Sequence, residues 1–448
     1  MMTKPLCIDV PYLDPIDLFA AHADKPFAQI LDSSMFDEGF GRYSFIALDP
    51  FTTFNTEENT FESLKVELAQ YPLETHAGMP PFQGGALGYF GYELLHQIEK
   101  LPQKEKDPFS VPAIFLGFYD VVCAFDHLHK KACIFSSGYP ELGPAREKRR
   151  HERAMWLQDT LYKTKKADAL LPSINLSWQS SFSPETYVQS VQKVIDYIRA
   201  GDIFQANLTQ RFSCLLPKQF KAFALYQKLR KTNPAPFSAY LNFGDFRIAS
   251  SSPERFLKLE NNQVDTRPIK GTRPRKADAK SDREQIKELK SSEKDLAENT
   301  MIVDLLRNDI SKVCEPHSVE VPELCKIYSF ATVHHLVSTV TGSLKSHHTA
   351  PELLKACFPG GSITGAPKVR AMEIISELEP HPRGPYCGAI GYIGFDGNMD
   401  TNIVIRTLVF KGDQVCLQVG GGIVIESDPQ AEYQETLDKA RALFQAFE

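Results

Sequence analysis

The chain has 448 residues, of which 42% are hydrophobic and 24% are charged, and its formal net charge is −6. These values are typical of a globular protein with a large core. They show no excess of positive charge that would indicate nucleic acid or an anionic membrane as a partner. No apolar run reaches the roughly 18 residues that a membrane span needs. The nine cysteines include no CxxC pair, which favours reduced thiols over disulfides or zinc. We therefore expect a cytoplasmic protein with a small-molecule ligand.

Short apolar runs separated by turn residues dominate the first third of the chain. Residues 27–57 alternate such runs with Asp, Ser and Pro, and the glycine-rich stretch 82–93 is typical of a strand that closely approaches another element. Residues 113–126 resemble a buried strand that can pair with 131–136. We predict an antiparallel sheet here and treat residues 1–140 as an amino-terminal region.

The composition changes between residues 141 and 182, where a charged helical run at 146–153 precedes polar sequence. We interpret 141–182 as a solvated helix and linker, followed by a third region at 183–448. In that region Ser183 caps a predicted helix that ends at Gly201.

A strand is predicted directly after this helix, at residues 203–212. Side chains alternate along a strand, so Gln205 and Asn207 share one face while Phe204 and Ala206 share the other. The polar face can line a site or face water, and periodicity alone does not separate the two.

Lys270 is a candidate nucleophile because it lies in a short, proline-punctuated stretch with Arg267, Arg273 and Arg275. We expect this stretch to be a loop. Neighbouring cations or desolvation lower the pKa of a lysine, and only its neutral amine attacks an electrophile. The alternative is a solvated basic loop without a catalytic role.

Two pairs of carboxylates are spaced to share a helix face, Asp295 with Glu298 and Glu432 with Glu435. Oxygen ligands of this kind suit Mg²⁺. Each pair also has a structural explanation, since acidic side chains in the first turn of a helix are stabilised by capping and by the helix dipole.

Other candidates come from glycine-rich turns and isolated polar residues. The predicted turns at Gly420–Gly422 and at residues 359–368 could hold an anion on backbone N–H groups, although neither matches a nucleotide fingerprint. Glu254 lies at a turn between predicted strands and is a candidate general acid, or else a solvated glutamate. His335 and Arg406 lie in apolar surroundings, where a structural role is the alternative.

Several ordered motifs resemble the chorismate-utilising enzymes, over residues 180–445. The motifs are Gly201–Leu208, Ser252–Phe256, Pro268–Arg273, Asp295–Asn299, His335–Ser338, Pro359–Met372, Gly420–Val424 and Glu432–Thr436, and Gly84–Tyr92 resembles the amino-terminal part of the same family. The resemblance implies an α+β fold like that of anthranilate synthase component I, with two facing, mostly antiparallel β-sheets, helices on the outside and the site between them. It also implies that residues 183–448 are the chorismate-binding catalytic region and that strands of the amino-terminal region share its sheets.

The resemblance implies a role for each candidate. Lys270 would attack carbon 2 of the chorismate ring while Glu254 protonates the hydroxyl that leaves carbon 4. Mg²⁺ would be held by Glu298 and Glu435, with Glu432 and Asp295 nearby. The expected substrate-binding residues are Gln205, Asn207, His335, Thr364, Tyr386, Arg406, Gly420, Gly421, Gly422 and Lys439.

Position 270 separates the reactions within the resembled family. Members that form 2-aminobenzoate typically have alanine there, whereas many that form 4-amino-4-deoxychorismate, a precursor of 4-aminobenzoate and folate, have lysine. Isochorismate-forming members place a water-activating lysine at the position of Gln205, whose amide is no base. The implied reaction is therefore amination of chorismate at carbon 4; the alternatives are 2-aminobenzoate formation and a non-catalytic regulator that binds chorismate or tryptophan.

Two partners follow from the same resemblance. The chain contains no recognisable glutaminase nucleophile motif, so ammonia is expected from a separate glutamine amidotransferase subunit in a heterodimer. Tryptophan is a further candidate ligand, because residues 30–33 partly match the segment that binds it in relatives.

Overall fold

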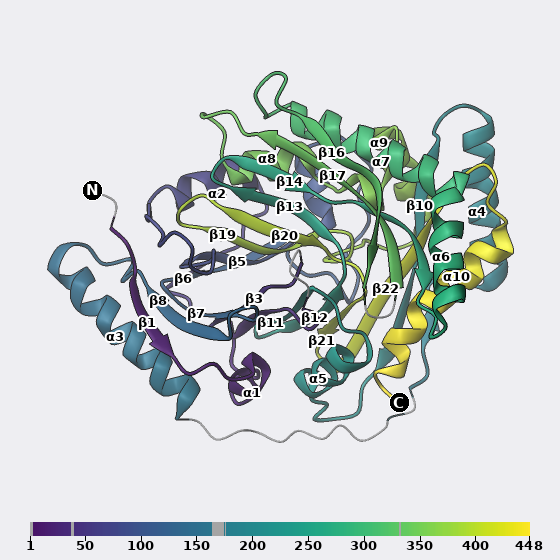
Figure 1. Ribbon diagram of the computed structural model, residues 1–448. Coiled ribbons are helices and arrows are strands. Elements are labelled where there is room, and N and C mark those ends of the chain that lie inside the picture. Colours follow the sequence, from purple (N-terminus) through teal and green to yellow (C-terminus); the bar gives the residue numbers. More distant parts are fainter. Residues whose placement is uncertain (1–2, 37–39, 164–173, 175, 331–332) are drawn as a thin grey trace.

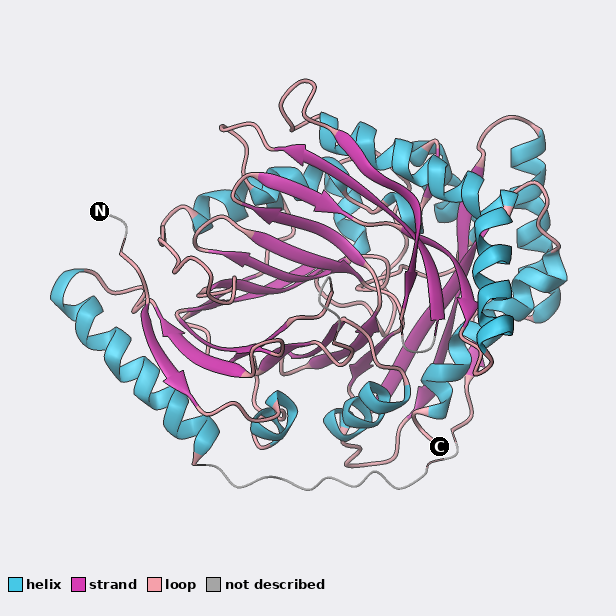
Figure 2. Ribbon diagram, in the orientation of Figure 1, coloured by secondary structure: helices cyan, strands magenta, loops and turns pink. Residues whose placement is uncertain are grey.

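The computed structural model of the protein describes residues 3–36, 40–163, 174, 176–330 and 333–448. Two large β-sheets face one another and most helices lie outside them (Figures 1 and 2). The predicted α+β fold is confirmed. Among the described residues, no helix combines the length and the apolar character needed to cross a membrane.

The first sheet contains strands from nearly the whole length of the chain. Its order is β1–β8–β7–β3–β2–β11–β12–β21–β22–β10–β18, and β9 also pairs with β10. The strands are β1 (Leu6–Val10), β2 (Gln29–Asp32), β3 (Tyr43–Ala47), β7 (Val121–Asp126), β8 (Lys131–Ser136), β9 (Gln179–Ser180), β10 (Gln205–Leu215), β11 (Phe237–Asn242), β12 (Phe246–Ser252), β18 (Gly365–Ala366), β21 (Thr407–Lys411) and β22 (Gln414–Ile423).

The second sheet has the order β15–β17–β14–β13–β20–β19–β5–β6–β4, and β16 also pairs with β17. Its strands are β4 (Thr52–Phe54), β5 (Gly85–Phe90), β6 (Ile114–Tyr119), β13 (Arg255–Glu260), β14 (Gln263–Thr266), β15 (Ile269–Pro274), β16 (Glu320–Ser329), β17 (Val333–Ser343), β19 (Ala389–Gly394) and β20 (Met399–Ile403). Both sheets mix strands from before residue 140 with strands from after residue 183: Leu31 of β2 pairs with Ala239 of β11, and Gly88 of β5 pairs with Gly391 of β19.

Several helices begin at side-chain caps, among them the helix that the sequence analysis predicted to start at Ser183. Ser183, Ser292 and Asp428 each accept a backbone hydrogen bond at the start of a helix, and proline follows directly after Ser183 and Asp428. The helices are α1 (Pro15–Ala20), α2 (Thr60–Leu68), η1 (Tyr92–Gln97), α3 (Gly143–Tyr162), α4 (Pro184–Arg199), α5 (Ala222–Thr232), α6 (Ala279–Ser291), α7 (Glu293–Ser311), α8 (Ala350–Cys357), η2 (Gly361–Ile363), α9 (Lys368–Leu378) and α10 (Pro429–Gln445), where η marks a 3₁₀-helix.

The charged run at 146–153 belongs to α3, which is less solvated than its composition indicates. Arg149 and Arg153 donate to the fully buried Asp120 at 3.1 Å each, and Leu157 is buried against the first sheet. The buried Asp120 carboxylate therefore accounts for two of the arginines in the charged run, Arg149 and Arg153. The remainder of the predicted linker, at 164–173 and 175, lies outside the described residues.

Two predicted loops are strands instead. The stretch around Lys270 forms β15, because Pro268 and Pro274 fall just before and at the end of the strand, where proline does not interrupt pairing. The pairing with β17 shifts between Lys270 and Thr272, and Gly271 takes φ +73° at this bulge. Gly420–Gly422, predicted as a turn, lie inside β22 and pair with β10.

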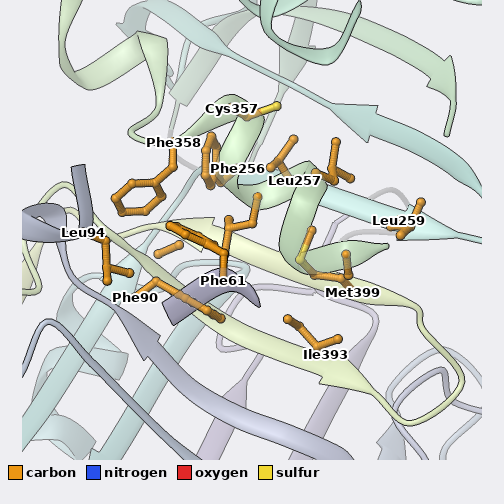
Figure 3. Close-up of a cluster of buried hydrophobic side chains, with 14 of the residues drawn as sticks. Phe61, Phe90, Leu94, Phe256, Leu257, Leu259, Cys357, Phe358, Ile393 and Met399 are labelled. Atoms are coloured by element: carbon orange, nitrogen blue, oxygen red, sulfur yellow. The ribbon is translucent and has the colours of Figure 1, made fainter. Parts of the chain in front are cut away.

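Helix α7 is fixed to the second sheet by a large apolar cluster (Figure 3). Ile302, Leu306 and Ile310 of α7 are buried in this cluster together with Leu257 and Met399 of the sheet. The spacing of four residues places them on one helix face. Because Glu298 lies one turn before Ile302, this packing also fixes the position of Glu298.

Leu306→Ala tests this anchoring. Leu306 is only 3% exposed, and deleting a leucine side chain from such a site costs about 2–5 kcal/mol of unfolding free energy. Urea unfolding of the variant would measure it, with the exposed Asn308→Ala on the same helix as control. Equal effects of both substitutions would contradict the assigned role of α7.

Candidate active site

Lys270, Glu254 and Asn207 converge on one residue, Ser362 in the short helix η2. The Lys270 Nζ donates to the Ser362 carbonyl oxygen at 3.3 Å, and the Asn207 Nδ2 donates to the same oxygen at 2.9 Å. The Ser362 side chain hydrogen-bonds to the Glu254 carboxylate. Residues from β15, β10 and the turn before β13 therefore meet where the two sheets approach one another.

The Lys270 amine is buried, and its side chain is 13% exposed. Burial lowers the pKa of Lys270, and the charge of Lys439 lowers it further, against the opposing charges of Glu298 and Glu254. The Nζ lies 4.0 Å from Glu298 Oε2. Desolvation, rather than a cluster of arginines, is therefore the origin of the shift.

The three arginines of this stretch have partners of their own. Arg267 pairs with Asp265 at 3.0 Å, Arg273 with Glu288 at 2.8 Å and Arg275 with Asp282 at 3.0 Å. Each guanidinium charge is thus offset locally. Of the two causes that the sequence offered for a lowered pKa of Lys270, desolvation dominates, and the contributing cation is Lys439 rather than these arginines.

Glu254 is buried beside the same serine and is only 7% exposed. Burial raises the pKa of Glu254 to about 7, although a hydrogen bond from Ser362, the charge of Lys270 and a backbone hydrogen bond at Ile269 oppose the rise. A carboxyl group with this pKa holds a proton near neutral pH and can release it, which is the property of a general acid.

Two other predicted carboxylates, those of Glu432 and Glu435, lie beside Gly421, and the charge of Glu435 acts on a third, Glu298. A Cβ placed on Gly421 would lie 3.1 Å from Glu432 Oε2 and 3.4 Å from Glu435 Oε1. Burial raises the pKa of Glu298 and of Glu432. Burial also opposes ionisation of Glu435, but the charge and hydrogen bond of Lys439 lower its pKa overall.

These carboxylates repel one another and have open space beside them, as expected of a cation site. They do not surround a common point with ligand spacing. Glu435 disfavours ionisation of both Glu298 and Glu432 by like charge, and glycine leaves open space beside their oxygens. No cluster of three or more acidic, His or Cys side chains with metal-ligand spacing occurs in the described residues. The donors are oxygens, so the chemistry fits Mg²⁺ with water and substrate completing its shell.

Asp295 is engaged elsewhere. Its Oδ2 accepts from Arg273 Nη2 at 3.2 Å, and its backbone N–H donates to the Ser292 side chain at 3.3 Å. Gly271 lies against Asp295, since a Cβ placed on Gly271 would lie 2.9 Å from Asp295 Cγ. Asp295 therefore supports the bulge after Lys270, and its assignment as a metal ligand stays a prediction.

The Gly420–Gly422 segment of β22 lies next to the side-chain amide of Gln205, which has no hydrogen-bond partner. A Cβ on Gly422 would lie 2.1 Å from Gln205 Nε2 and 3.0 Å from Asn207 Oδ1. The Gln205 side chain is fully buried, and both its Nε2 and Oε1 lack a hydrogen-bond partner. A buried polar group without a partner is costly, so this amide is available to a ligand that enters beside Gly422.

Arg406 and His335 lie close enough for the charge of Arg406 to act on the His335 imidazole. Arg406 adopts φ +51° and donates to Asn233 at 3.4 Å, but within the described residues it has no carboxylate at salt-bridge distance. Burial and the charge of Arg406 lower the pKa of His335 to about 4, so the imidazole is neutral near pH 7. His335 Nδ1 lies 2.8 Å from the Thr272 hydroxyl.

The remaining predicted residues occupy supporting positions. The fully buried Thr364 donates its hydroxyl to Gly360, and its carbonyl accepts from the Asn207 N–H at 2.7 Å. Lys439 pairs with Glu435 at 2.6 Å and donates to the Gly420 carbonyl at 2.9 Å. Tyr386 is buried next to Cys387 and Arg383.

Sequence reasoning missed two features of the site. One is Ser362, whose contacts depend on where its backbone carbonyl points. The other is the fully buried ion pair of Arg383 with Glu379, in which Arg383 also donates to the carbonyls of Ile363 and Asn207. The only sequence signal for this pair is opposite charge at a spacing of four residues.

Comparison of this chain with known proteins identifies the enzyme family to which it belongs. A family model described as chorismate binding enzyme matches residues 31–445, and the chain belongs to this family. The aminodeoxychorismate synthase component 1 of Escherichia coli (strain K12) is 41% identical, with 96% of this chain and 95% of that protein covered. The anthranilate synthase component 1 of Thermus thermophilus is 37% identical, with 97% and 95% covered.

A solved structure agrees with this assignment. Anthranilate synthase component I from Streptococcus pneumoniae TIGR4 superposes with a TM-score of 0.79 at 33% identity, over 90% of this chain and 92% of that chain. The resemblance stated from the motifs is confirmed, and the chain is a chorismate-utilising enzyme.

Glu254→Gln should change how stability depends on pH. The pKa of Glu254 is about 7 in the folded chain, against the ordinary value of 4.5. The stability associated with this group is therefore fully present below pH 4.5 and is lost as the pH rises through 7. Glutamine stays neutral, so the variant should gain on the wild type by at most about 3 kcal/mol between pH 5 and pH 8.

Urea unfolding of both proteins at the two pH values would measure this gain. A stability difference that is the same at pH 5 and pH 8 would show that Glu254 titrates at its ordinary pKa.

Proposed function

We propose that this chain is the chorismate-aminating component of an aminodeoxychorismate synthase, which forms 4-amino-4-deoxychorismate from chorismate and ammonia. The observation that carries the proposal is the Lys270 amine, buried and joined through Ser362 to Glu254. The 41% identity to a relative of that name supports the same assignment.

Lys270 acts as the covalent nucleophile. Its lowered pKa increases the neutral fraction of the amine. The hydrogen bond to the Ser362 carbonyl fixes the side chain, so the nitrogen lone pair attacks carbon 2 of the ring. A C2–N bond forms, both ring double bonds shift by one position towards carbon 4, and the C4–O bond breaks.

Glu254 supplies the proton that this step needs. With a pKa of about 7 it is substantially protonated at neutral pH, and the hydroxyl leaves carbon 4 as water. Ammonia then adds at carbon 4, both double bonds shift back and the C2–N bond to Lys270 breaks. The Glu254 carboxylate takes up the proton that ammonia releases, and the sum is chorismate plus ammonia giving 4-amino-4-deoxychorismate and water.

Chorismate carries two carboxylates, and the chain offers two places for them. Arg406, which lacks a carboxylate partner in the described part of the chain, is suited to one. The strand edge at Gly420–Gly422 is suited to the other, because β21 pairs only with Gln414–Leu417 of β22 and glycine permits close approach. The free amide of Gln205 can hydrogen-bond a ring substituent.

Mg²⁺ would be held by Glu298 and Glu435, with Glu432 and Asp295 assisting. When bound, it would neutralise a substrate carboxylate. The chain's own contribution is to bury these carboxylates beside Lys270: Glu298 lies 4.0 Å from the amine.

Two partners complete the proposal. A glutamine amidotransferase subunit supplies ammonia in a heterodimer, as the word component in the names of the relatives supports. A bound tryptophan would occupy a separate cavity of about 780 Å³, which Leu31, Asp32 and Ser33 help to line. The enzyme is proposed to act in the cytoplasm.

Product identification tests the reaction. The purified chain, given chorismate, Mg²⁺ and an ammonium salt, should form 4-amino-4-deoxychorismate, identified by liquid chromatography and mass spectrometry. Chelation with EDTA should abolish turnover. Fluorescent 2-aminobenzoate as the product would instead make the chain an anthranilate synthase component, and chorismate binding without turnover would indicate a regulator.

Lys270→Ala tests covalent catalysis. Loss of the nucleophile should lower kcat by at least about 100-fold, while chorismate binding measured by calorimetry is retained. Lys258→Ala, on β13 of the same sheet but separated from β15 by β17 and β14, is the control and should keep wild-type rates. Lys270 would be excluded as the covalent nucleophile if Lys270→Ala turned over normally, or if quenched wild-type enzyme carried its chorismate adduct on another residue.

A further inference from the structure

The glycine-rich stretch 359–368 is closed by the side chain of its last residue, Lys368. The Lys368 Nζ donates to the Pro359 carbonyl at 2.9 Å and to the Cys357 carbonyl at 3.0 Å. It also donates to the Asp309 carboxylate of α7 at 2.5 Å. A lysine ammonium group has three N–H donors, so each donor of Lys368 has one acceptor. The beginning and the end of this stretch are therefore joined through a single ammonium group.

The same stretch, which we call the Ser362 loop, holds the catalytic side chains. The Ser362 carbonyl accepts from the side chains of Lys270 and Asn207. The Ser362 side chain hydrogen-bonds to Glu254. Because the peptide group is planar, the direction of a carbonyl follows from the course of the backbone on either side of it. The contacts that fix the ends of the Ser362 loop therefore also fix the carbonyl that binds Lys270.

The Ser362 loop lies against helix α7. A Cβ placed on Gly361 would lie 2.7 Å from Leu305 Cδ2 of this helix. The side chain of Lys368 is 12% exposed and that of Asp309 is 1% exposed, so their ion pair is buried between the loop and the helix. Asp309 has a second cation, since Lys312 Nζ lies 3.0 Å from its Oδ1. The Asp309 carboxylate would therefore keep a positive partner if Lys368 were replaced.

Apolar packing holds the start of the Ser362 loop but does not orient its peptide groups. Phe358, which directly precedes the loop, is 3% exposed, and its ring centroid lies 6.3 Å from that of Phe256 (Figure 3). Apolar contacts are non-directional, whereas hydrogen bonds depend on the angles at the donor and at the carbonyl. Lys368 therefore determines how the two peptide groups whose carbonyls it binds are turned.

We propose that Lys368 is a positioning residue that fixes the Ser362 carbonyl and thereby directs the Lys270 amine toward carbon 2 of chorismate. The inference rests on the proposed function, because only covalent attack by Lys270 needs this direction. Misplacement of a reacting group by about 1 Å can slow a reaction about 100-fold. Chorismate itself is proposed to be held by Arg406 and Gly420–Gly422, so loss of Lys368 should lower kcat more than it changes KM.

Lys368→Met tests the inference with ammonium as the nitrogen source. Methionine has a similar length but no N–H donor, so both loop carbonyls lose their partner. We expect kcat to fall at least about tenfold and KM for chorismate to stay within about twofold of wild type. A second measurement omits ammonia: the mass of the quenched protein reports the adduct of Lys270 with chorismate, formed with loss of water. The rate of adduct formation should fall by the same factor as kcat.

Lys312→Met is the matched control. It removes the other cation that pairs with Asp309 but leaves the bonds from Lys368 to the carbonyls of Cys357 and Pro359. Its kcat should stay within about twofold of wild type. Urea unfolding of both variants separates lost stability from lost positioning. A smaller folded fraction would lower the amplitude of adduct formation and leave its rate unchanged.

Each other outcome decides against the inference. Lys368→Gln keeps an amide donor and replaces Lys368→Met if the latter does not fold; it should show a smaller kcat loss. Wild-type kcat in either folded variant would overturn the positioning role, as would an equal kcat loss in Lys312→Met. A raised KM with unchanged kcat would assign the loop to chorismate binding, and failure of both Lys368 variants to fold would make Lys368 a stabilising residue only. Wild-type protein that forms neither the adduct nor 4-amino-4-deoxychorismate would refute the proposed function itself.

Discussion

Burial of one amine among carboxylates is the constraint on which the rest of the site depends. A lysine removed from water loses its charge readily, whereas nearby carboxylates favour the charged form. At Lys270 burial prevails, even though Glu298 lies 4.0 Å away, and the pKa is lowered. The same burial raises the pKa of Glu254 to about 7. One dry pocket therefore produces both a usable amine and a usable acid, which two separate exposed side chains could not provide at neutral pH.

The side chains of this pocket must be held in fixed positions. The buried ion pair of Arg383 with Glu379 contributes to this. Arg383 and Glu379 are almost fully buried, and their hydrogen bonds reach the backbone of residues around the site. Arg383 donates to the carbonyls of Asn207 and Ile363, and Glu379 accepts from the N–H and hydroxyl of Thr209. Strand β10 and helix η2 are thereby joined. Since Ser362 lies within η2, the position of the carbonyl that binds Lys270 follows from a pair that touches no catalytic side chain.

The parts of this structure that sequence could predict are those set by local chemistry. Helix starts at Ser183 and Asp428 follow from capping, and the alternation along β10 follows from strand geometry. Glu254 and Lys270 could be named as an acid and a nucleophile, but their environment could not be derived, because it depends on residues about a hundred positions away. The three arginines illustrate this: adjacent to Lys270 in sequence, they pair with carboxylates elsewhere. The orientation of the Ser362 carbonyl has no sequence signal at all.

Charge balance links the proposed role of Lys270 as nucleophile to the proposed role of the nearby carboxylates as Mg²⁺ ligands. Glu298, Glu432 and Glu435 lie near Lys294, Lys439 and Lys270, so three acids face three bases when every group is ionised. If Lys270 is neutral, as a nucleophile must be, one negative charge remains uncompensated beside the place proposed for a substrate with two carboxylates. A divalent cation at these oxygens would reverse the sign of that region and make the site attractive to an anion. The proposed need for Mg²⁺ thus follows from the proposed chemistry of Lys270, because an amine that gives up its charge leaves Glu298 without its nearest counter-ion.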